Sequence, residues 1–474
     1  MAMLGDIVQS VEMLLKLIRK PQPYVDPDLD PVLLVPGIAG SILKAVDHQN
    51  GNEERVWVRI LEADSKFCSK LWSRFDPSTG KTVSLDPSTS ITVPEERYGL
   101  YAIDVLDPDL IIGQESVYYF HDMIVEMIKW GFQEGKTLFG FGYDFRQSNR
   151  LQDTLDRLAA KLESVYKASG GKKINIISHS MGGLLVKCFM GLHSDVFEKY
   201  VKNWIAIAVP FRGAPGYIAS TFLNGVSFVE GWEQNFFISK WSMHQLIDYG
   251  GENIPLPFNL EILKWAKETH KVLSEAKVPS GVKFYNIYGI NLETPHSVCY
   301  GSEEAPITDI RDLRFSEPTY VCVDGDGTVP VESAKADGLN AEARVGIPGE
   351  HRGILCEPHL YRILKHWLKA GNPDPFYNPI NDYVILPTTF EMESLHENGI
   401  QVTSLKEEWE IITEDQGNQD ANKNSLVSSV SVSQGPSKQS SRSKAHATVI
   451  VHPQNEGKQH VELNAISVSI DAQS

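Results

Sequence analysis

The chain has 474 residues, which is enough for one large α/β domain with insertions or for two domains. Hydrophobic residues make up 42% of it, an ordinary share for a globular protein with a buried core. The formal net charge of −17, from 44 basic and 61 acidic residues, argues against nucleic acid as the main partner, because proteins bind nucleic acids by neutralising phosphates.

The five cysteines are widely scattered and have no metal-ligand spacing, which indicates a reduced intracellular protein without a metal site. The first residues show no basic stretch followed by a continuous apolar one, so we expect no secretory signal. No stretch is long and apolar enough to span a bilayer. We therefore expect a cytoplasmic protein, either free in the cytosol or peripheral on the cytosolic face of a membrane.

Residues 7–18 place apolar side chains at helical spacing and are followed by Arg19 and Lys20, which predicts an amphipathic helix. Such a helix more often packs on its own domain than on a membrane surface, and we expect the first here. Prolines in residues 21–31 then predict a linker. Residues 1–30 are thus expected to form an N-terminal helix and linker.

The first apolar strand, residues 32–35, leads into a turn bounded by Gly37 and Gly40. A serine hydrolase needs a backbone N–H group from a loop after an early strand to bind the oxyanion that forms during ester cleavage. The two glycines allow the backbone to approach a substrate closely. We therefore predict the amide of Ile38 as one oxyanion donor; the alternative is an ordinary strand-to-loop turn.

Residues 50–75 carry several aromatic side chains among charged ones, including Trp57 and Trp72. So dense an aromatic insertion is either the core of a small cap or a surface that enters lipid.

Residues 222–247 are a second apolar and aromatic segment, which includes Phe228 and Trp232. An apolar loop of this kind beside a serine site is expected to act as a lid over a hydrophobic substrate. A buried pair of cap helices is the alternative.

Helical and strand patterns alternate through the rest of the chain. This alternation predicts an α/β fold, with a mostly parallel sheet that helices cover on both faces. We predict helices over residues 118–130, 151–166 and 360–368, and strands over residues 138–145, 204–209 and 284–288.

The sequence SHSMGG of residues 178–183 joins an isoleucine-rich strand to an apolar helix. A strand, a tight turn and a helix are the setting of a nucleophile elbow, in which a strained turn presents a serine above the sheet. The positions two before and two after the nucleophile must be small, and Ser178 takes the first, where glycine is usual. The motif predicts Ser180 as the nucleophile and the amide of Met181 as the second oxyanion donor. A serine that caps an ordinary buried helix is the alternative.

Two later strands end in side chains that suit the activation of a serine, which needs a general base and an acid to orient that base. The first strand ends in the sequence DGDG of residues 324–327, and the second ends at His351. The order Ser180, Asp326, His351 is the chain order of α/β-hydrolases. Asp324 competes for the acid role, but the glycines that flank Asp326 give it the freedom to turn inward.

Among the 14 histidines, His351 directly follows a strand and lies shortly after the aspartate turn. His296 and His359 are weaker candidates for the base. His179 is next to the nucleophile and is expected to point away from it and to pack.

The composition changes near residue 414, where Asn, Gln, Ser and Lys become dominant through residue 443. This predicts a disordered linker within a C-terminal extension, residues 379–474. Apolar and polar residues alternate in residues 447–451 and 461–470, which fits a terminal β-hairpin docked on a sheet edge.

A set of motifs in this chain resembles those of the lecithin–cholesterol acyltransferase family and its lysosomal phospholipase A relatives, and most closely the plant branch of cytosolic phospholipases A. The motifs are PGIAG (residues 36–40), YDFR (143–146), SHSMGG (178–183), GDGTV (325–329) and His351. The resemblance covers roughly residues 31–368, so we place the hydrolase domain at residues 31–378. It implies an α/β-hydrolase fold, a small membrane-binding insertion at residues 50–75 and a lid at 222–247.

The resemblance also implies the roles of individual residues. It implies a triad of Ser180, Asp326 and His351, with the amides of Ile38 and Met181 as oxyanion donors. It further implies lipid contact by the insertion and the lid, for which the candidates are Trp57, Trp72, Phe228 and Trp232. Phe145 stands where relatives usually carry tryptophan. Secreted relatives have a disulfide in the insertion, whereas this chain has Cys68 alone there, which argues against lipoprotein binding and sterol acyl transfer.

The expected function is that of a serine-dependent phospholipase A at a membrane surface. It would hydrolyse acyl esters of phosphatidylcholine-like glycerophospholipids to free fatty acid and lysophospholipid, with no metal or other cofactor. An O-acyltransferase is the nearest alternative, because an alcohol that replaces water would accept the acyl group. An inactive lipid-binding protein and a soluble esterase for small esters are the alternatives from other classes. The triad argues against the first, and the aromatic insertion and lid argue against the second.

Overall fold

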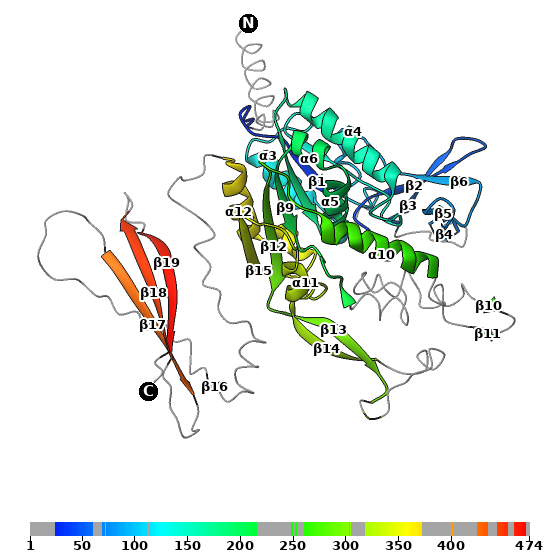
Figure 1. Cartoon of the computed structure of the whole chain (residues 1–474). Helices are drawn as coiled ribbons and strands as arrows, with labels where there is room; N and C mark the ends of the chain where they lie inside the picture. The colour runs from blue at the N-terminus through cyan, green and yellow to red at the C-terminus, as the bar shows by residue number, and fades with distance from the viewer. Residues whose placement is uncertain are drawn as a thin grey trace, which may run out of the picture.

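The structure is a computed structural model of the chain (Figure 1). It describes residues 24–59, 69–71, 73–110, 113–215, 248–249, 252–253, 260–302, 304 and 318–371, and the strands at 400–401, 424–434, 443–453 and 459–470. The helix predicted at residues 7–18 and the lid at 222–247 lie outside the described residues. Of the helices within the described ranges, none combines the length and apolar character needed to cross a bilayer.

The centre of the molecule is a six-stranded sheet in the order β15-β12-β9-β8-β1-β7, in which all neighbours run parallel. Every residue of β1 and β8 is buried, as expected for strands covered on both faces. The six strands are β1 (Val32–Val35), β7 (Leu138–Gly140), β8 (Ile174–His179), β9 (Val201–Ile207), β12 (Lys283–Ile290) and β15 (Ala343–Pro348).

Helices cover both faces of this sheet (Figure 1). Successive side chains of β1 show the two faces: Val32 and Leu34 pack into one hydrophobic cluster, and Leu33 and Val35 into the other. The first cluster includes α3 (His121–Lys129) and α12 (Pro358–Leu368), and the second includes α4 (Gln152–Ala168), α5 (Met181–Leu192) and α6 (Ser194–Tyr200). This three-layer arrangement confirms the α/β-hydrolase fold predicted from the sequence.

An antiparallel insertion follows the loop after β1. Its three-stranded sheet has the order β3-β2-β6 and a small core of Leu43, Ala45 and Val56. A separate hairpin, β4–β5, lies within it. The strands are β2 (Leu43–Asp47), β3 (Glu53–Trp57), β4 (Ser73–Asp76), β5 (Lys81–Ser84) and β6 (Thr89–Thr92), so the insertion extends beyond residues 50–75 at both ends.

The YDFR segment anchors the insertion to the central sheet instead of continuing β7, which the sequence had predicted to run to residue 145. Arg146 forms two hydrogen bonds with Asp144, each 2.8 Å long, and donates a third to the carbonyl oxygen of Leu71, also at 2.8 Å. The side chain of Gln147 pairs with Thr82 as a strand would: it donates to the carbonyl at 2.6 Å and accepts from the amide at 2.8 Å.

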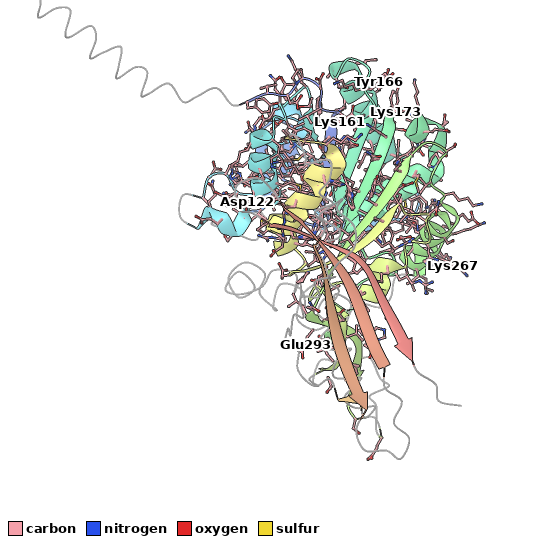
Figure 2. All side chains as sticks on the ribbon, turned by 90° about the vertical axis from the view of Figure 1, so that its left-hand side faces the viewer. Asp122, Lys161, Tyr166, Lys173, Lys267 and Glu293 are labelled. Atoms are coloured by element: carbon pink, nitrogen blue, oxygen red, sulfur yellow. The ribbon has the colours of Figure 1, made fainter. Side chains whose placement is uncertain are left out.

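The strand that leads to Asp326 is not part of the central sheet. β14 (Pro318–Gly325) pairs antiparallel with β13 (Leu292–Tyr300), and Glu293 of this hairpin lies beyond the end of the central sheet (Figure 2). The remaining elements are η1 (Arg97–Gly99), η2 (Gln114–Val117), η4 (Gly353–Cys356), α10 (Leu260–Glu275), α11 (Val331–Lys335), β10 (Asp248–Tyr249) and β11 (Glu252–Asn253).

The C-terminal extension forms a four-stranded antiparallel sheet. The predicted terminal hairpin is present as β18 (Ser443–Pro453) and β19 (Gln459–Ile470). At the other edge of the sheet, β16 (Ile400–Gln401) pairs with the strand that precedes the hairpin. β17 (Asn424–Gln434) differs from the prediction, because it lies where the composition indicates a disordered linker. Val430 and Val432 alternate with Ser429, Ser431 and Ser433, so a strand pattern is present inside the polar composition.

Candidate active site

Ser180 occupies the sharp turn between β8 and α5. Its φ of +54° and ψ of −132° lie in a region of backbone conformation that residues other than glycine rarely adopt. Holding a residue in such a conformation costs roughly 1–3 kcal/mol of conformational free energy. The Ser180 amide donates to the carbonyl of Ile207 at 2.9 Å, which ties the turn to the neighbouring strand β9. The side chain is 4% exposed. This is the geometry of the nucleophile elbow that the sequence predicts.

The small residues around the turn allow its neighbours to approach closely. A Cβ atom on Gly182 would lie 2.2 Å from the carbonyl oxygen of Pro36, and one on Gly37 would lie 2.6 Å from Cβ of Ser180. Ser178 is fully buried, and its hydroxyl oxygen accepts a hydrogen bond from the buried indole of Trp204 at 2.8 Å. Serine at this position therefore gives the indole an acceptor that glycine would not provide.

The structure brings the three predicted triad side chains together. Nε2 of His351 lies 2.9 Å from Oγ of Ser180, and Nδ1 lies 2.7 Å from Oδ2 of Asp326. The other carboxylate oxygen of Asp326 accepts hydrogen bonds from the amides of Val329 at 2.6 Å and Thr328 at 3.0 Å. A proton on Nδ1 then leaves Nε2 of His351 as the acceptor for the hydroxyl proton of Ser180.

The competing acid and the competing histidines lie elsewhere. Oδ1 of Asp324 accepts the amide of Asn291 at 2.6 Å and so fixes the turn between β12 and β13. His296 pairs with Glu332 at 2.6 Å, and Nδ1 of His359 lies 2.9 Å from a nitrogen of Arg362 on α12.

The two predicted oxyanion donors come from two segments that adjoin the nucleophile. Met181 is the first residue of α5, where an amide has no partner within the helix and the helix dipole favours negative charge. Ile38 lies in the turn after β1 that packs on the elbow through Gly37. Among the residues that the structure describes, neither amide donates to a protein acceptor. Both N–H groups can therefore donate to a substrate oxygen.

Trp57 contacts the turn after β1 that carries Ile38, residues 36–41, which we call the oxyanion loop. The sequence did not predict this contact. The indole Nε1 of Trp57 donates to the carbonyl oxygen of Ala39 at 2.7 Å, and its ring packs edge-on against Phe145 with centroids 5.6 Å apart. Ala39 itself has a φ of +60°, a conformation that needs such external support. Of the two alternatives for the insertion, these contacts favour cap packing for Trp57. The other proposed lipid-contact residues, Trp72, Phe228 and Trp232, lie outside the described residues.

We predict that Trp57→Phe lowers kcat for a soluble ester about three- to tenfold, because it removes one hydrogen bond of the oxyanion loop and keeps the packing. Steady-state kinetics without vesicles measure the change. Trp265→Phe is the matched control. Trp265 lies on α10, away from the loop, and its indole donates to the hydroxyl of Ser148 at 2.7 Å. A loss confined to assays with vesicles would instead assign Trp57 to lipid contact.

In the described part of the chain, no group of three His, Cys, Asp or Glu side chains is arranged to hold a metal ion.

The family model described as lecithin:cholesterol acyltransferase matches residues 68–230, which include the nucleophile elbow. The chain is 62% identical to "Lecithin-cholesterol acyltransferase-like 4" of Arabidopsis thaliana over 99% of both chains. It is 44% identical to "Phospholipase A(1) LCAT3" of the same plant, over 72% of this chain and 91% of the relative. It is 25% identical to "Lysosomal phospholipase A and acyltransferase" of Bos taurus, over 54% of this chain and 66% of the relative. The chain therefore belongs to the lecithin:cholesterol acyltransferase family.

Proposed function

We propose that this protein is a serine-dependent phospholipase A that hydrolyses acyl esters of phosphatidylcholine-like glycerophospholipids to free fatty acid and lysophospholipid. The hydrogen-bonded line from Ser180 through His351 to Asp326 carries the proposal, because it is the arrangement that makes a serine hydroxyl nucleophilic. Family membership supports a phospholipid-acting hydrolase or acyltransferase, since its named relatives include a phospholipase A(1) and a lysosomal phospholipase A and acyltransferase.

The geometry suggests how the reaction would proceed. Oγ of Ser180 attacks the ester carbonyl while Nε2 of His351 takes its proton, and Asp326 stabilises the imidazolium that results. The amides of Ile38 and Met181 bind the oxyanion. His351 then returns the proton to the departing lysophospholipid oxygen, which leaves an acyl group on Ser180. A water molecule deprotonated by His351 releases the fatty acid and restores the hydroxyl.

We also propose that the protein works in the cytoplasm, peripherally on a phospholipid membrane. The composition of the insertion and the lid supports this, because Trp72, Phe228 and Trp232 are large apolar side chains suited to an interface.

Acyl transfer is a second candidate activity. The burial of the site favours it: Ser180 is 4% exposed and His351 is 6% exposed. An acyl-enzyme in a site that admits little water persists long enough to react with an alcohol. Hydrolysis and transfer share every step up to the acyl-enzyme, so the acceptor alone separates them.

A product analysis tests the proposal. Purified protein is incubated with vesicles of a phosphatidylcholine whose sn-1 and sn-2 chains differ in mass, with and without a sterol acceptor and a chelator. We expect free fatty acid and lysophospholipid in equal amounts, at a rate that the chelator leaves unchanged.

Other outcomes would redirect the assignment. Sterol ester in place of free fatty acid would make acyl transfer the main activity. Loss of turnover in the chelator would contradict a metal-independent reaction. The absence of any product from folded protein would favour an inactive lipid-binding protein, and equal rates on monomeric and aggregated ester would favour a soluble esterase.

A further inference from the structure

Two buried side chains outside the triad connect the oxyanion loop to residues 350–353, the base loop, which carries His351. The amide of Gly37 donates to the hydroxyl oxygen of Tyr119 at 2.7 Å. This oxygen lies 2.6 Å from Nδ1 of His179, and Nε2 of His179 lies 2.9 Å from the carbonyl oxygen of His351. Tyr119 is 7% exposed and His179 is 1% exposed. The contacts therefore form a continuous path from the residue before Ile38 to the residue that acts as base.

The donors and acceptors of this path are consistent in one arrangement. Because the Tyr119 oxygen accepts from Gly37, its own proton is available to donate to Nδ1 of His179. Nε2 of His179 then carries the other proton and donates it to the His351 carbonyl. This arrangement needs a neutral imidazole. Burial, with a smaller contribution from the neighbouring His351, lowers the pKa of His179 well below its usual value and keeps the ring neutral at physiological pH.

We propose that Tyr119 and His179 are positioning residues, which hold the oxyanion loop and the base loop in a fixed relation on either side of Ser180. The proposal rests on the function proposed above. The two loops are more than 300 positions apart in the sequence, at Gly37 and His351, and no strand pairing joins their tips. A misplacement of about 1 Å between reacting groups costs about a hundredfold in rate. The contacts through Tyr119 and His179, which we call the brace, therefore affect catalysis by fixing the distance between the two loops.

A second set of contacts closes the brace from the side of the base. Arg352, the residue after His351, donates to the carbonyl oxygens of Ser116 at 2.7 Å and Tyr118 at 3.3 Å. The base loop thus holds the segment that carries Tyr119. The Tyr119 ring also fills the space beside the oxyanion loop, since a Cβ atom on Gly40 would lie 2.6 Å from it.

His179 is a positioning residue and not a second base. Both of its ring nitrogens already have partners, Tyr119 and the His351 carbonyl, and among the described residues the base contact to Ser180 comes from His351.

The test is Tyr119→Phe, which removes the hydroxyl and keeps the ring. Tyr118→Phe is the matched control, because its ring packs at a tilt against His121 with centroids 4.1 Å apart and this packing survives the change. We expect Tyr119→Phe to lower kcat for a soluble ester roughly ten- to a hundredfold with KM little changed. The control should match the wild type.

A comparison of each oxygen ester with its thionoester assigns the loss to the oxyanion loop. Backbone N–H groups bind a developing negative charge on sulfur poorly, so the wild type should strongly prefer the oxygen ester. We expect this preference to shrink in Tyr119→Phe. A merely structural role for the hydroxyl would lower the melting temperature and leave both kcat and the preference unchanged, which would overturn the proposal.

Amide hydrogen exchange tests the brace without any turnover. We expect faster exchange at residues 36–41 and 350–353 in Tyr119→Phe, and in His179→Phe, than in the wild type or in Tyr118→Phe. Unchanged exchange in both loops would refute the brace, even in a fully active enzyme. Faster exchange in both variants, together with a wild type that releases no fatty acid, would instead support the brace and contradict the proposed function.

Discussion

Ser180→Ala is expected to reduce phospholipid turnover by about a millionfold, because among the described residues the hydroxyl bonded to the base is that of Ser180. The His351 imidazole would keep its bond to Asp326 and would lack a nucleophile to activate. A fluorophosphonate probe should label the wild type at Ser180 and leave the variant unlabelled. Release of fatty acid from phosphatidylcholine vesicles gives the rate.

Thermal unfolding should hardly change in Ser180→Ala, since alanine keeps the Cβ atom and the elbow backbone. Ser178→Ala is the matched control, two positions earlier in the same turn. It removes the acceptor of the buried Trp204 indole, which should cost about 1–3 kcal/mol of stability while most of the activity remains. Activity near that of the wild type in Ser180→Ala would eliminate this serine as the nucleophile.

The elements that position the site were predictable because burial on both faces leaves a clear pattern. The strand β1 is a continuous apolar run and β8 is rich in isoleucine, and SHSMGG can join a strand to a helix in few ways. The order Ser180, Asp326, His351 then located the acid and base, each of which follows a strand. The position of a site residue could thus be predicted from the sequence wherever one local segment determines it.

The supports of the site were not predictable for the opposite reason. Tyr119 belongs to the run VYYFH, in which no spacing distinguishes the tyrosine that reaches Gly37 from the one that packs against His121. Trp57 was expected at lipid because large aromatic side chains suit both a cap core and an interface. These roles depend on tertiary contacts between distant segments.

Asp326→Asn is expected to lower kcat about ten-thousandfold, with little change in folding. The asparagine oxygen can still accept the amides of Val329 and Thr328 at Oδ1. Its NH2 group would then face Nδ1 of His351, which must become an acceptor, so the ring proton moves to Nε2. In that tautomer His351 cannot take the proton of Ser180. Initial rates on a soluble ester measure the loss.

Asp324→Asn is the matched control, because it makes the same chemical change two positions earlier. Its side-chain oxygen can still accept the Asn291 amide that Asp324 now binds at 2.6 Å, so the turn between β12 and β13 should persist. We expect activity within a fewfold of the wild type. A larger loss for Asp324→Asn than for Asp326→Asn would transfer the acid role to Asp324. Comparable large losses would mean that both carboxylates are needed, since one would then hold the turn that aims the other at His351.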